Sequence, residues 1–342
     1  MTKPAPGPWR DVVIAGVYNT KQARSLPTTS RQLLVEATLG ALDDAGLTIA
    51  DLDGVAAGAM SDALVYDLSL GPAWVREGGA HPILYLFEAV AAISAGLASV
   101  VVVAGGEAGV YGDRGATAPW TRPENEFVAP FGLFTAAEFA LIARAHMDRY
   151  GTTPEQLATV AATIRNNGDV NPEAVYFGRG PFTVDDVLAS RMIADPFHLL
   201  DCSMTSEGGC AIVLARADRA ADLRQRPAYL LGAAHDTFGP PYHHPPRWDL
   251  AGRHSDGIIN GQVGGRAARL AMAPAGLGPA DIDVLELYDP FSFEIIRQLE
   301  AFGFCAAGEG GPFVADGNID FDGEFPLNTD GGLLSFSHAG AN

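Results

Sequence analysis

Apolar positions along this sequence follow a helical spacing in some segments and form short valine-rich runs in others. The first helical pattern begins after the candidate caps Thr28, Thr29 and Ser30, continues through RQLLVEATLGALDDA, and stops at Gly46. Runs rich in branched apolar residues predict strands at 11–17, 53–60, 98–105, 210–216 and 228–236. Helices that alternate with strands in this way are typical of an α/β protein.

A long segment with helical patterns of its own interrupts the first group of predicted strands. It spans residues 107–209 and contains FGLFTAAEFALIARAHMDRYG and TTPEQLATVAATIRNNG. Thr153 followed by Pro154 is typical of a helix start, and Gly151 is typical of a helix end. We predict a helical insertion here, which can either cap a cleft or pack in a dimer.

Two distant stretches of the chain share one pattern. AGLTIADLDGV (45–55) and AGLGPADIDVL (275–285) each contain Ala-Gly-Leu, a capped turn, an Asp-aliphatic-Asp step and the start of a strand. The offset of 230 residues indicates two related halves, although this helix-to-strand link is also common by itself. We therefore predict an N-terminal half at 1–225, which includes the insertion, and a C-terminal half at 226–342.

The charge balance narrows the range of partners. The chain has 342 residues, of which 48% are hydrophobic and 18% charged, as expected for a large globular enzyme. Its formal net charge is −19, so its field repels polyanions and excludes nucleic acid as an expected partner. A small anion such as a coenzyme A ester is still compatible with this charge, provided that a few basic side chains surround it.

Cysteine usage and hydropathy predict a cytoplasmic protein. The three cysteines, Cys202, Cys210 and Cys305, show no CxxC spacing, which indicates a reducing compartment. The N-terminal segment has no signal-peptide apolar core, and the run Val100–Val103 is too short to cross a membrane. Glycine-rich phosphate loops of the nicotinamide or nucleoside triphosphate type are absent from the sequence.

The stretch ELYDPFSFE, which follows the predicted strand VLEL, contains the first candidate for chemistry. Tyr288 and Asp289 lie where this strand ends, and strand ends carry functional groups in layered α/β folds. By itself, such a tyrosine is more often a buried aromatic residue with a bonded hydroxyl. Asp289 is expected to cap a helix or to orient a neighbour, and capping is the better expectation.

A proline-rich loop offers candidate ligand-binding groups. FGPPYHHPPRWD combines cationic and aromatic side chains that can line a cleft for an adenine nucleotide or a steroid, namely Tyr242, His243, His244 and Arg247. Adjacent histidines in an extended segment point to opposite sides, so we predict no metal site here.

Four motifs, taken in order, resemble the thiolase superfamily. They are GGE at 105–107, HLLDCSMTSEGGCAIVL at 198–214, ELYDPFS at 286–292 and NTDGGLLSFSHAGAN at 328–342, and together they are most similar to the sterol-carrier-protein branch. The resemblance implies a five-layer αβαβα fold built from two pseudosymmetric halves. The duplication predicts a final strand after His338, yet the sequence ends at Asn342. We therefore expect the second half to be truncated at its last strand, either because a C-terminal segment is missing from the sequence or because the second sheet ends short.

Departures from the family pattern are informative about chemistry. Thiolases carry a nucleophilic cysteine at the position that falls here at about Gly79, where no thiol, hydroxyl or amine is present. The His-Asp pair of the sterol-carrier branch is replaced by Tyr288-Asp289, whereas the histidine of the Gly-His-Pro motif is retained as His338. These features resemble the thiolase-superfamily aldolases that cleave steroid side chains, although those have a second tyrosine at the position of His338.

The resemblance implies a lyase that acts on a steroid or similarly bulky β-hydroxyacyl-CoA and releases a ketone and acetyl- or propionyl-CoA. It implies Tyr288 as the base, His338 as an oxyanion donor or final acid, and Gly340 near the coenzyme A moiety. Tyrosine is a weak base at neutral pH, because its reference pKa of about 10 lies roughly three units too high. A thiolase-like acyltransferase and a non-catalytic acyl-CoA-binding subunit are the alternatives.

The same resemblance implies an assembly. The related aldolases form a central homodimer flanked by a small accessory protein with an oligonucleotide-binding-type fold and a zinc ribbon. Any zinc would therefore belong to the partner, and no cofactor is expected on this chain beyond the coenzyme A of its substrate.

Overall fold

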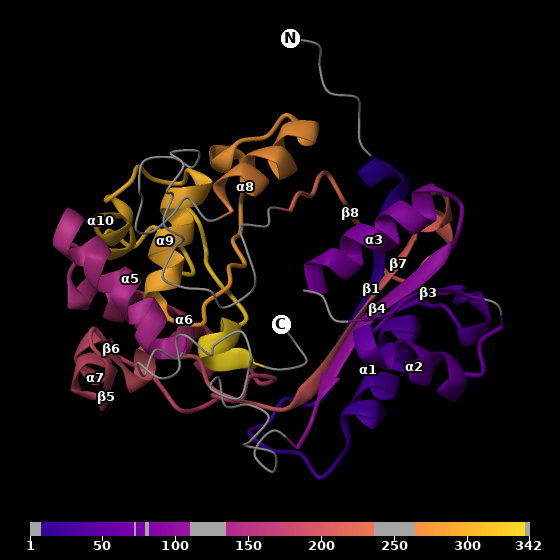
Figure 1. The fold of residues 1–342 in the computed structure, drawn as a ribbon, viewed down its shortest axis with the longest axis horizontal. Coiled ribbons are helices and arrows are strands. Elements are labelled where there is room, and N and C mark those ends of the chain that lie inside the picture. Colours follow the sequence, from indigo (N-terminus) through magenta and orange to yellow (C-terminus); the bar gives the residue numbers. More distant parts are fainter. Residues whose placement is uncertain (1–7, 72, 79–81, 110–134, 236–263, 339–342) are drawn as a thin grey trace.

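The computed structural model describes residues 8–71, 73–78, 82–109, 135–235 and 264–338. Its main feature is a six-stranded sheet with the order β3-β2-β4-β7-β1-β8, seen on the right of Figure 1. The strands are β1 (Val12–Asn19), β2 (Gly54–Ala56), β3 (Trp74–Arg76), β4 (Val100–Glu107), β7 (Gly208–Arg216) and β8 (Ala228–Tyr229). Strands β2, β3 and β4 pair in parallel, and the other pairs are antiparallel.

Both faces of this sheet are buried under helices. Along β4, Val100 and Val102 belong to the apolar cluster beneath α1, whereas Val101 and Val103 belong to the cluster beneath α3. This alternation follows from the two-residue repeat of a strand, and it explains why the run of four valines is apolar throughout. Helices α1 (Ser30–Ala45) and α2 (Ser61–Asp67) cover one face and α3 (Pro82–Ser94) covers the other (Figure 1).

Local signals in the sequence set the limits of α1. The Thr29 side chain accepts a hydrogen bond from the Gln32 backbone N–H, and the Gln32 side chain accepts one from the Thr29 N–H. Gly46 ends the helix in the left-handed region with φ 74°. The predicted helix between these residues is confirmed.

The two repeated stretches have nearly the same backbone conformation at their glycine. Gly46 has φ 74° and ψ 22°, and Gly276 has φ 73° and ψ 24°. In each case the leucine that follows, Leu47 or Leu277, donates its N–H to a carbonyl in the preceding helical turn, at 2.8 Å and 3.3 Å.

The capped turns of the two repeats also match. Asp51 ends a 3₁₀ turn (Ile49–Asp51) and accepts the N–H of Thr48 at 3.0 Å. Asp281 ends the corresponding turn (Pro279–Asp281) and accepts the N–H of Gly278 at 2.8 Å. The shared sequence pattern therefore encodes a shared local structure at both sites.

The insertion leaves and re-enters the sheet at one point. Glu107 at the end of β4 pairs with Gly208 at the start of β7, so the segment between them loops out from adjacent strands. Its described part consists of helices and a two-stranded ribbon, namely α5 (Thr135–Tyr150), α6 (Pro154–Val170), α7 (Val184–Ala189), β5 (Met192–Ala194) and β6 (Phe197–His198). The helices predicted before Gly151 and after Thr153 are confirmed.

This insertion shares an apolar core with the C-terminal part of the chain. Phe291 contacts Phe139 and Phe197, each with ring centroids 5.0 Å apart, and the second pair is stacked. The core joins α5 and α6 to α9 (Ser292–Phe302) and α10 (Gly310–Ala315), on the left of Figure 1. Within the described residues, the insertion is thus part of the body of the protein rather than a free cap.

The C-terminal half is mostly helical in the part that the structure describes. Besides α9 and α10 it contains α8 (Gly265–Met272), and its sheet is represented there by a single parallel bridge between Leu285 and Leu327. Strand β8, predicted to open this half, pairs with β1 at the edge of the first sheet. The ranges proposed for the two halves stay a prediction.

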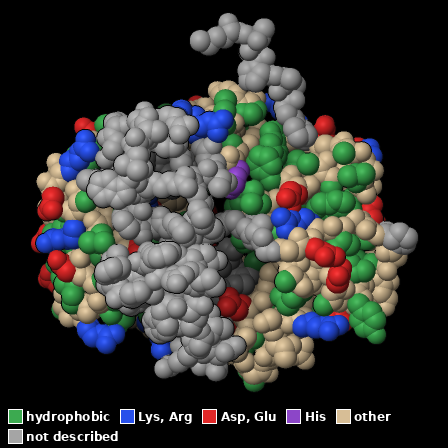
Figure 2. All heavy atoms as spheres, viewed as in Figure 1, with side chains coloured by type: hydrophobic (Ala, Val, Ile, Leu, Met, Phe, Trp, Pro, Cys, Tyr) green, Lys and Arg blue, Asp and Glu red, His purple; other side chains and the backbone are tan. Residues whose placement is uncertain are grey.

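Charged side chains are interspersed over the face drawn in Figure 2. Basic groups lie singly or in small groups among acidic and apolar ones, so the described residues on this face form no continuous basic surface. Among the described helices, none combines the length and apolarity that crossing a bilayer requires.

Candidate active site

The stretch VLEL, predicted to be a strand, forms only an isolated bridge at Leu285. The backbone just beyond this bridge, which we call the Tyr288 strand end, is fixed by a buried asparagine. The Leu287 N–H donates to Asn328 Oδ1 at 2.7 Å, and Asn328 Nδ2 donates to the Leu287 carbonyl at 2.9 Å. One residue later, the Tyr288 carbonyl accepts Gln298 Nε2 at 2.6 Å. The backbone is therefore held on both sides, while the Tyr288 side chain is 44% exposed and accessible to a ligand.

Asp289 connects this strand end to the turn that precedes His338. Its buried carboxylate accepts the N–H of Leu333 at 2.8 Å and of Leu334 at 3.1 Å, at the start of the helical turn Gly332–Phe336. Burial raises the pKa of Asp289 to about 8, and the two N–H donors oppose that rise. The capping role predicted for Asp289 is confirmed.

The residues after Asp289 bind the segment Asp201–Met204. The Ser203 N–H donates to the Pro290 carbonyl at 2.9 Å, and Ser292 Oγ donates to Asp201 Oδ1 at 2.6 Å. One backbone hydrogen bond and one side-chain hydrogen bond thus join the Tyr288 strand end to a segment that lies about ninety residues earlier.

His338 is anchored to the same segment. Its backbone N–H donates to Ser206 Oγ at 2.7 Å, and its ring Nδ1 lies 2.9 Å from the Met204 carbonyl. Burial lowers the pKa of His338, and the Met204 carbonyl partly opposes this effect, so the ring is neutral near pH 7. Residues 201–206 are therefore the common support of the two groups that sequence reasoning selected, Tyr288 and His338.

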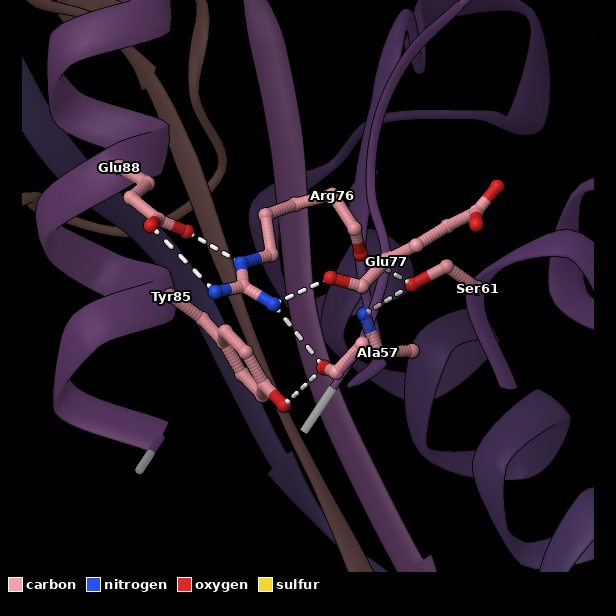
Figure 3. Close-up of polar contacts among 7 residues, drawn as sticks. Ala57, Ser61, Arg76, Glu77, Tyr85 and Glu88 are labelled. Carbon is pink, nitrogen blue, oxygen red and sulfur yellow. Dashed lines mark hydrogen bonds and ion pairs between the residues drawn. The ribbon is translucent and has the colours of Figure 1, made fainter. Parts of the chain in front are cut away.

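A second network holds the turn just before the position of Gly79 (Figure 3). The carbonyl of Gly78 accepts Tyr85 Oη at 2.9 Å and Arg76 Nη1 at 3.0 Å. The Arg76 guanidinium lies 4.9 Å from the Tyr85 ring centroid and pairs with Glu88. Its charge is thereby neutralised within the network, which makes Arg76 a support of the turn rather than a site for an anion.

The cysteines of the DCSMTSEGGC motif are half-buried thiols. Burial raises the pKa of Cys202 to about 12 and that of Cys210 to about 11. The Cys202 thiol donates to the His198 carbonyl at 3.3 Å. Neither group is available as a thiolate nucleophile near neutral pH.

Several predicted ligand-binding residues fall outside the described part of the chain. These are the loop residues Tyr242, His243, His244 and Arg247, together with Gly340 near the C-terminus. Their proposed contacts with an acyl-CoA stay predictions.

Sequence reasoning missed the polar residues that support His338. Gln22 lies outside every motif noted above, whereas Ser206 and Ser337 lie within two of the thiolase-like motifs, at 198–214 and 328–342. Those motifs indicated a family but assigned no role to Ser206, Ser337 or the Met204 carbonyl, which contact His338 or each other. Only the folded chain brings these groups together.

A helix-covered sheet with a helical insertion, and a strand-end tyrosine and a C-terminal histidine on one support, are compatible with the predicted thiolase resemblance. Residues 258–342 match the family model described as "Thiolase C-terminal domain-like". Relatives that are more than 30% identical over nearly the whole chain agree with this match, and the chain belongs to that superfamily. The predicted thiolase-like α/β fold is confirmed.

Two curated relatives stand out. A protein named "Acetyl-CoA acetyltransferase" from Methanothermobacter thermautotrophicus is 34% identical over 96% of this chain and 86% of its own length. A "Steroid side-chain-cleaving aldolase" from Thermomonospora curvata is 35% identical over 94% of this chain and 85% of its own length.

One solved structure is similar in both fold and sequence. The structure titled "Ltp2-ChsH2(DUF35) aldolase" matches with a TM-score of 0.83 and 32% identity, over 96% of this chain and 86% of that one. The resemblance to the steroid-cleaving aldolases predicted from the motifs is thus confirmed at the level of family.

Proposed function

We propose that this protein is a carbon–carbon lyase that cleaves a steroid, or similarly bulky, β-hydroxyacyl-CoA by a retro-aldol reaction. The products are a ketone and a short acyl-CoA, acetyl- or propionyl-CoA. One observation carries the proposal: Tyr288 and His338 share one support, residues 201–206, in a chain that has no cysteine near Gly79. The 35% identity to a steroid side-chain-cleaving aldolase supports the choice of substrate class.

The reaction makes three chemical demands. A base must accept the proton of the β-hydroxyl group, a donor must stabilise the enolate on the thioester oxygen, and an acid must return a proton to the α-carbon. Tyr288 and His338 together offer one phenol and one imidazole for these tasks. No metal or electron carrier takes part in this scheme, so coenzyme A enters only as part of the substrate.

An acyltransferase is the second candidate, because one relative at 34% identity is named an acetyl-CoA acetyltransferase. That chemistry passes through an acyl-enzyme and needs a nucleophile, whereas the described thiols are half-buried and desolvation raises their pKa values. Exchange of labelled free coenzyme A into acyl-CoA, with an acyl-enzyme trapped by acid quench, would establish the transferase. Absence of exchange during steroid cleavage supports the lyase.

Substitution of Tyr288 by phenylalanine tests the proposal. Because the side chain is 44% exposed and its backbone contacts are retained, we expect an unchanged fold and a loss of cleavage of at least about 100-fold. The assay follows the ketone product of a tertiary β-hydroxyacyl-CoA by mass spectrometry. Tyr66→Phe, which alters a tyrosine that is 80% exposed on α2, is the matched control.

Near-normal turnover by Tyr288→Phe would reject the assigned site. A wild-type protein that binds the acyl-CoA but never cleaves it would instead favour the third alternative, a non-catalytic binding subunit.

We also propose that the protein works as a homodimer with a small accessory protein of the oligonucleotide-binding type, which carries any zinc. Strand β3 supports the dimer, because it pairs only with β2 among the described strands and leaves one edge for a second copy. The similar solved structure is titled as a complex, which supports an accessory subunit. Sedimentation equilibrium, alone and with a co-expressed partner, tests both expectations.

A further inference from the structure

The ring of His338 is held in one tautomer by its neighbour. A carbonyl oxygen can only accept a hydrogen bond, so the contact of 2.9 Å between His338 Nδ1 and the Met204 carbonyl requires a proton on Nδ1. In the neutral ring, Nε2 then carries a lone pair. Among the described residues, none donates to this Nε2 atom.

A directed chain of hydrogen bonds fixes the backbone beneath this ring. Gln22 Nε2 donates to the carbonyls of Thr20 and Gly209, at 2.8 Å and 3.2 Å, which assigns the other end of the amide as its oxygen. Gln22 Oε1 in turn accepts from Ser337 Oγ at 2.8 Å. The hydrogen of the Ser337 hydroxyl is thereby used.

The remaining links have only one possible direction. Ser206 Oγ lies 2.8 Å from Ser337 Oγ, and since Ser337 donates to Gln22, Ser206 must donate to Ser337. Ser206 then accepts the backbone N–H of His338 at 2.7 Å. The chain therefore runs from the His338 N–H through two hydroxyl groups to an amide oxygen.

Burial makes this arrangement stable against exchange with water. Ser206 is 0% exposed, Ser337 1% and Gln22 6%. A buried hydroxyl that loses its partner pays the full cost of desolvation, so each link enforces the next. His338 is consequently held at its backbone by Ser206 and at its ring by the Met204 carbonyl.

We propose that His338 is the proton acceptor of the retro-aldol reaction through Nε2, and that Ser206, Ser337 and Gln22 are positioning residues for it. This inference rests on the proposed function. It assigns the role of the base to His338, whereas the family resemblance implies Tyr288. Tyr288 then takes the second role, as the hydroxyl donor to the thioester oxygen.

One side chain, His338, both accepts the proton and returns it. His338 Nε2 accepts the β-hydroxyl proton, the Cα–Cβ bond breaks, and its electron pair forms the enolate while the C–O bond becomes the ketone carbonyl. The Tyr288 O–H donates a hydrogen bond to the enolate oxygen. The Nε2–H of the imidazolium then delivers the same proton to Cα, so no further reactant is consumed.

Nuclear magnetic resonance of protein labelled with ¹⁵N at histidine tests the tautomer directly. The two nitrogens of a neutral ring differ strongly in chemical shift, and the signals of His338 are assigned by their loss in His338→Asn. We expect the protonated nitrogen to be Nδ1 at pH 7.5. A protonated Nε2 would overturn the inference, whether or not the enzyme cleaves a steroid.

Substitution of Ser206 tests positioning. In Ser206→Ala we expect kcat to fall by about 10- to 100-fold with little change in KM, together with altered His338 ring signals. Ser206→Thr, which keeps the hydroxyl group, should recover both. The matched control is Thr38→Val, because Thr38 is a buried hydroxyl in α1 that donates to the Leu34 carbonyl, away from the chain.

The outcomes distinguish a failure of the positioning role from a failure of the proposed function. Unchanged kcat and ring signals in Ser206→Ala would remove its positioning role. A wild-type protein with the expected tautomer but no cleavage would reject the proposed function and leave the structural assignment intact.

Discussion

Arg165 of α6 is the side chain whose loss should weaken the fold and the candidate site together. Its guanidinium donates to the carbonyls of Leu200 at 2.8 Å, Leu334 at 2.7 Å and Cys202 at 2.9 Å, and it is 1% exposed. It also lies 4.8 Å from the ring centroid of Tyr176. One residue therefore joins the insertion, the 201–206 support and the turn before His338.

Replacing Arg165 with methionine keeps the apolar stem but leaves three carbonyls without a donor, of which that of Leu334 is buried and those of Leu200 and Cys202 are half-buried. A hydrogen bond from a charged group contributes about 1.5–3 kcal/mol, so the gross loss is about 4–9 kcal/mol. Burying a guanidinium has its own desolvation cost, which the substitution removes. We expect the free energy of unfolding to fall by a net amount of about 3–5 kcal/mol. This is a large share of the roughly 5–15 kcal/mol that stabilises a typical protein.

Urea unfolding followed by tryptophan fluorescence and circular dichroism measures this loss. Arg179→Met is the matched control, because Arg179 is exposed and lies 4.9 Å from the same Tyr176 ring; its effect should stay below about 0.5 kcal/mol. A loss of less than about 1 kcal/mol in Arg165→Met, with unchanged denaturant dependence, would refute the argument.

Two further perturbations test other parts of the fold. Glu138 is 2% exposed, its Oε1 has no partner in the described structure, and burial raises its pKa to about 7. The folded state therefore holds this proton more tightly than the unfolded state, and the free energy of unfolding should fall as pH rises from about 4.5 to about 7. Glu138→Gln should abolish this dependence and stabilise the protein by about 3 kcal/mol at pH 8. Urea unfolding at about pH 4.5 and at about pH 8 measures both effects. A Cβ on Gly168 would meet Ser335 Oγ at 2.2 Å, so Gly168→Ala should lower stability by about 1–3 kcal/mol in the same assay, whereas Gly105→Ala, with open space at that position, should have a much smaller effect.

Elements defined by neighbouring residues were predictable from the sequence. The caps Thr29 and Thr153 and the terminator Gly46 act through contacts within one helical turn, which a linear pattern contains. The strand predicted at 53–60 was too long, since β2 ends at Ala56. The next residue, Ala57, donates its N–H to Ser61 Oγ at 2.8 Å and starts a turn. Apolar spacing alone does not reveal this contact.

In the candidate site, too, only the residues that lie in short sequence motifs were predicted. Tyr288 and His338 were identified through motifs that resemble a family, because each motif is a short run of residues. Ser206 and Ser337, by contrast, meet across 131 positions, and Gln22 and Ser337 across 315. Such contacts depend on how the insertion packs and on the strand register, which no local pattern specifies.

The matched turns at Gly46 and Gly276 bear on how the molecule arose and how it can be rebuilt. The glycine dihedral angles of the two stretches agree within two degrees, and five of the eight residues at 45–52 recur at 275–282. The turn thus tolerates different residues at the remaining three positions. If the two halves are related as predicted, an exchange of residues 45–52 with 275–282 would join corresponding segments, and a chain that still folds would show that the two turns are interchangeable.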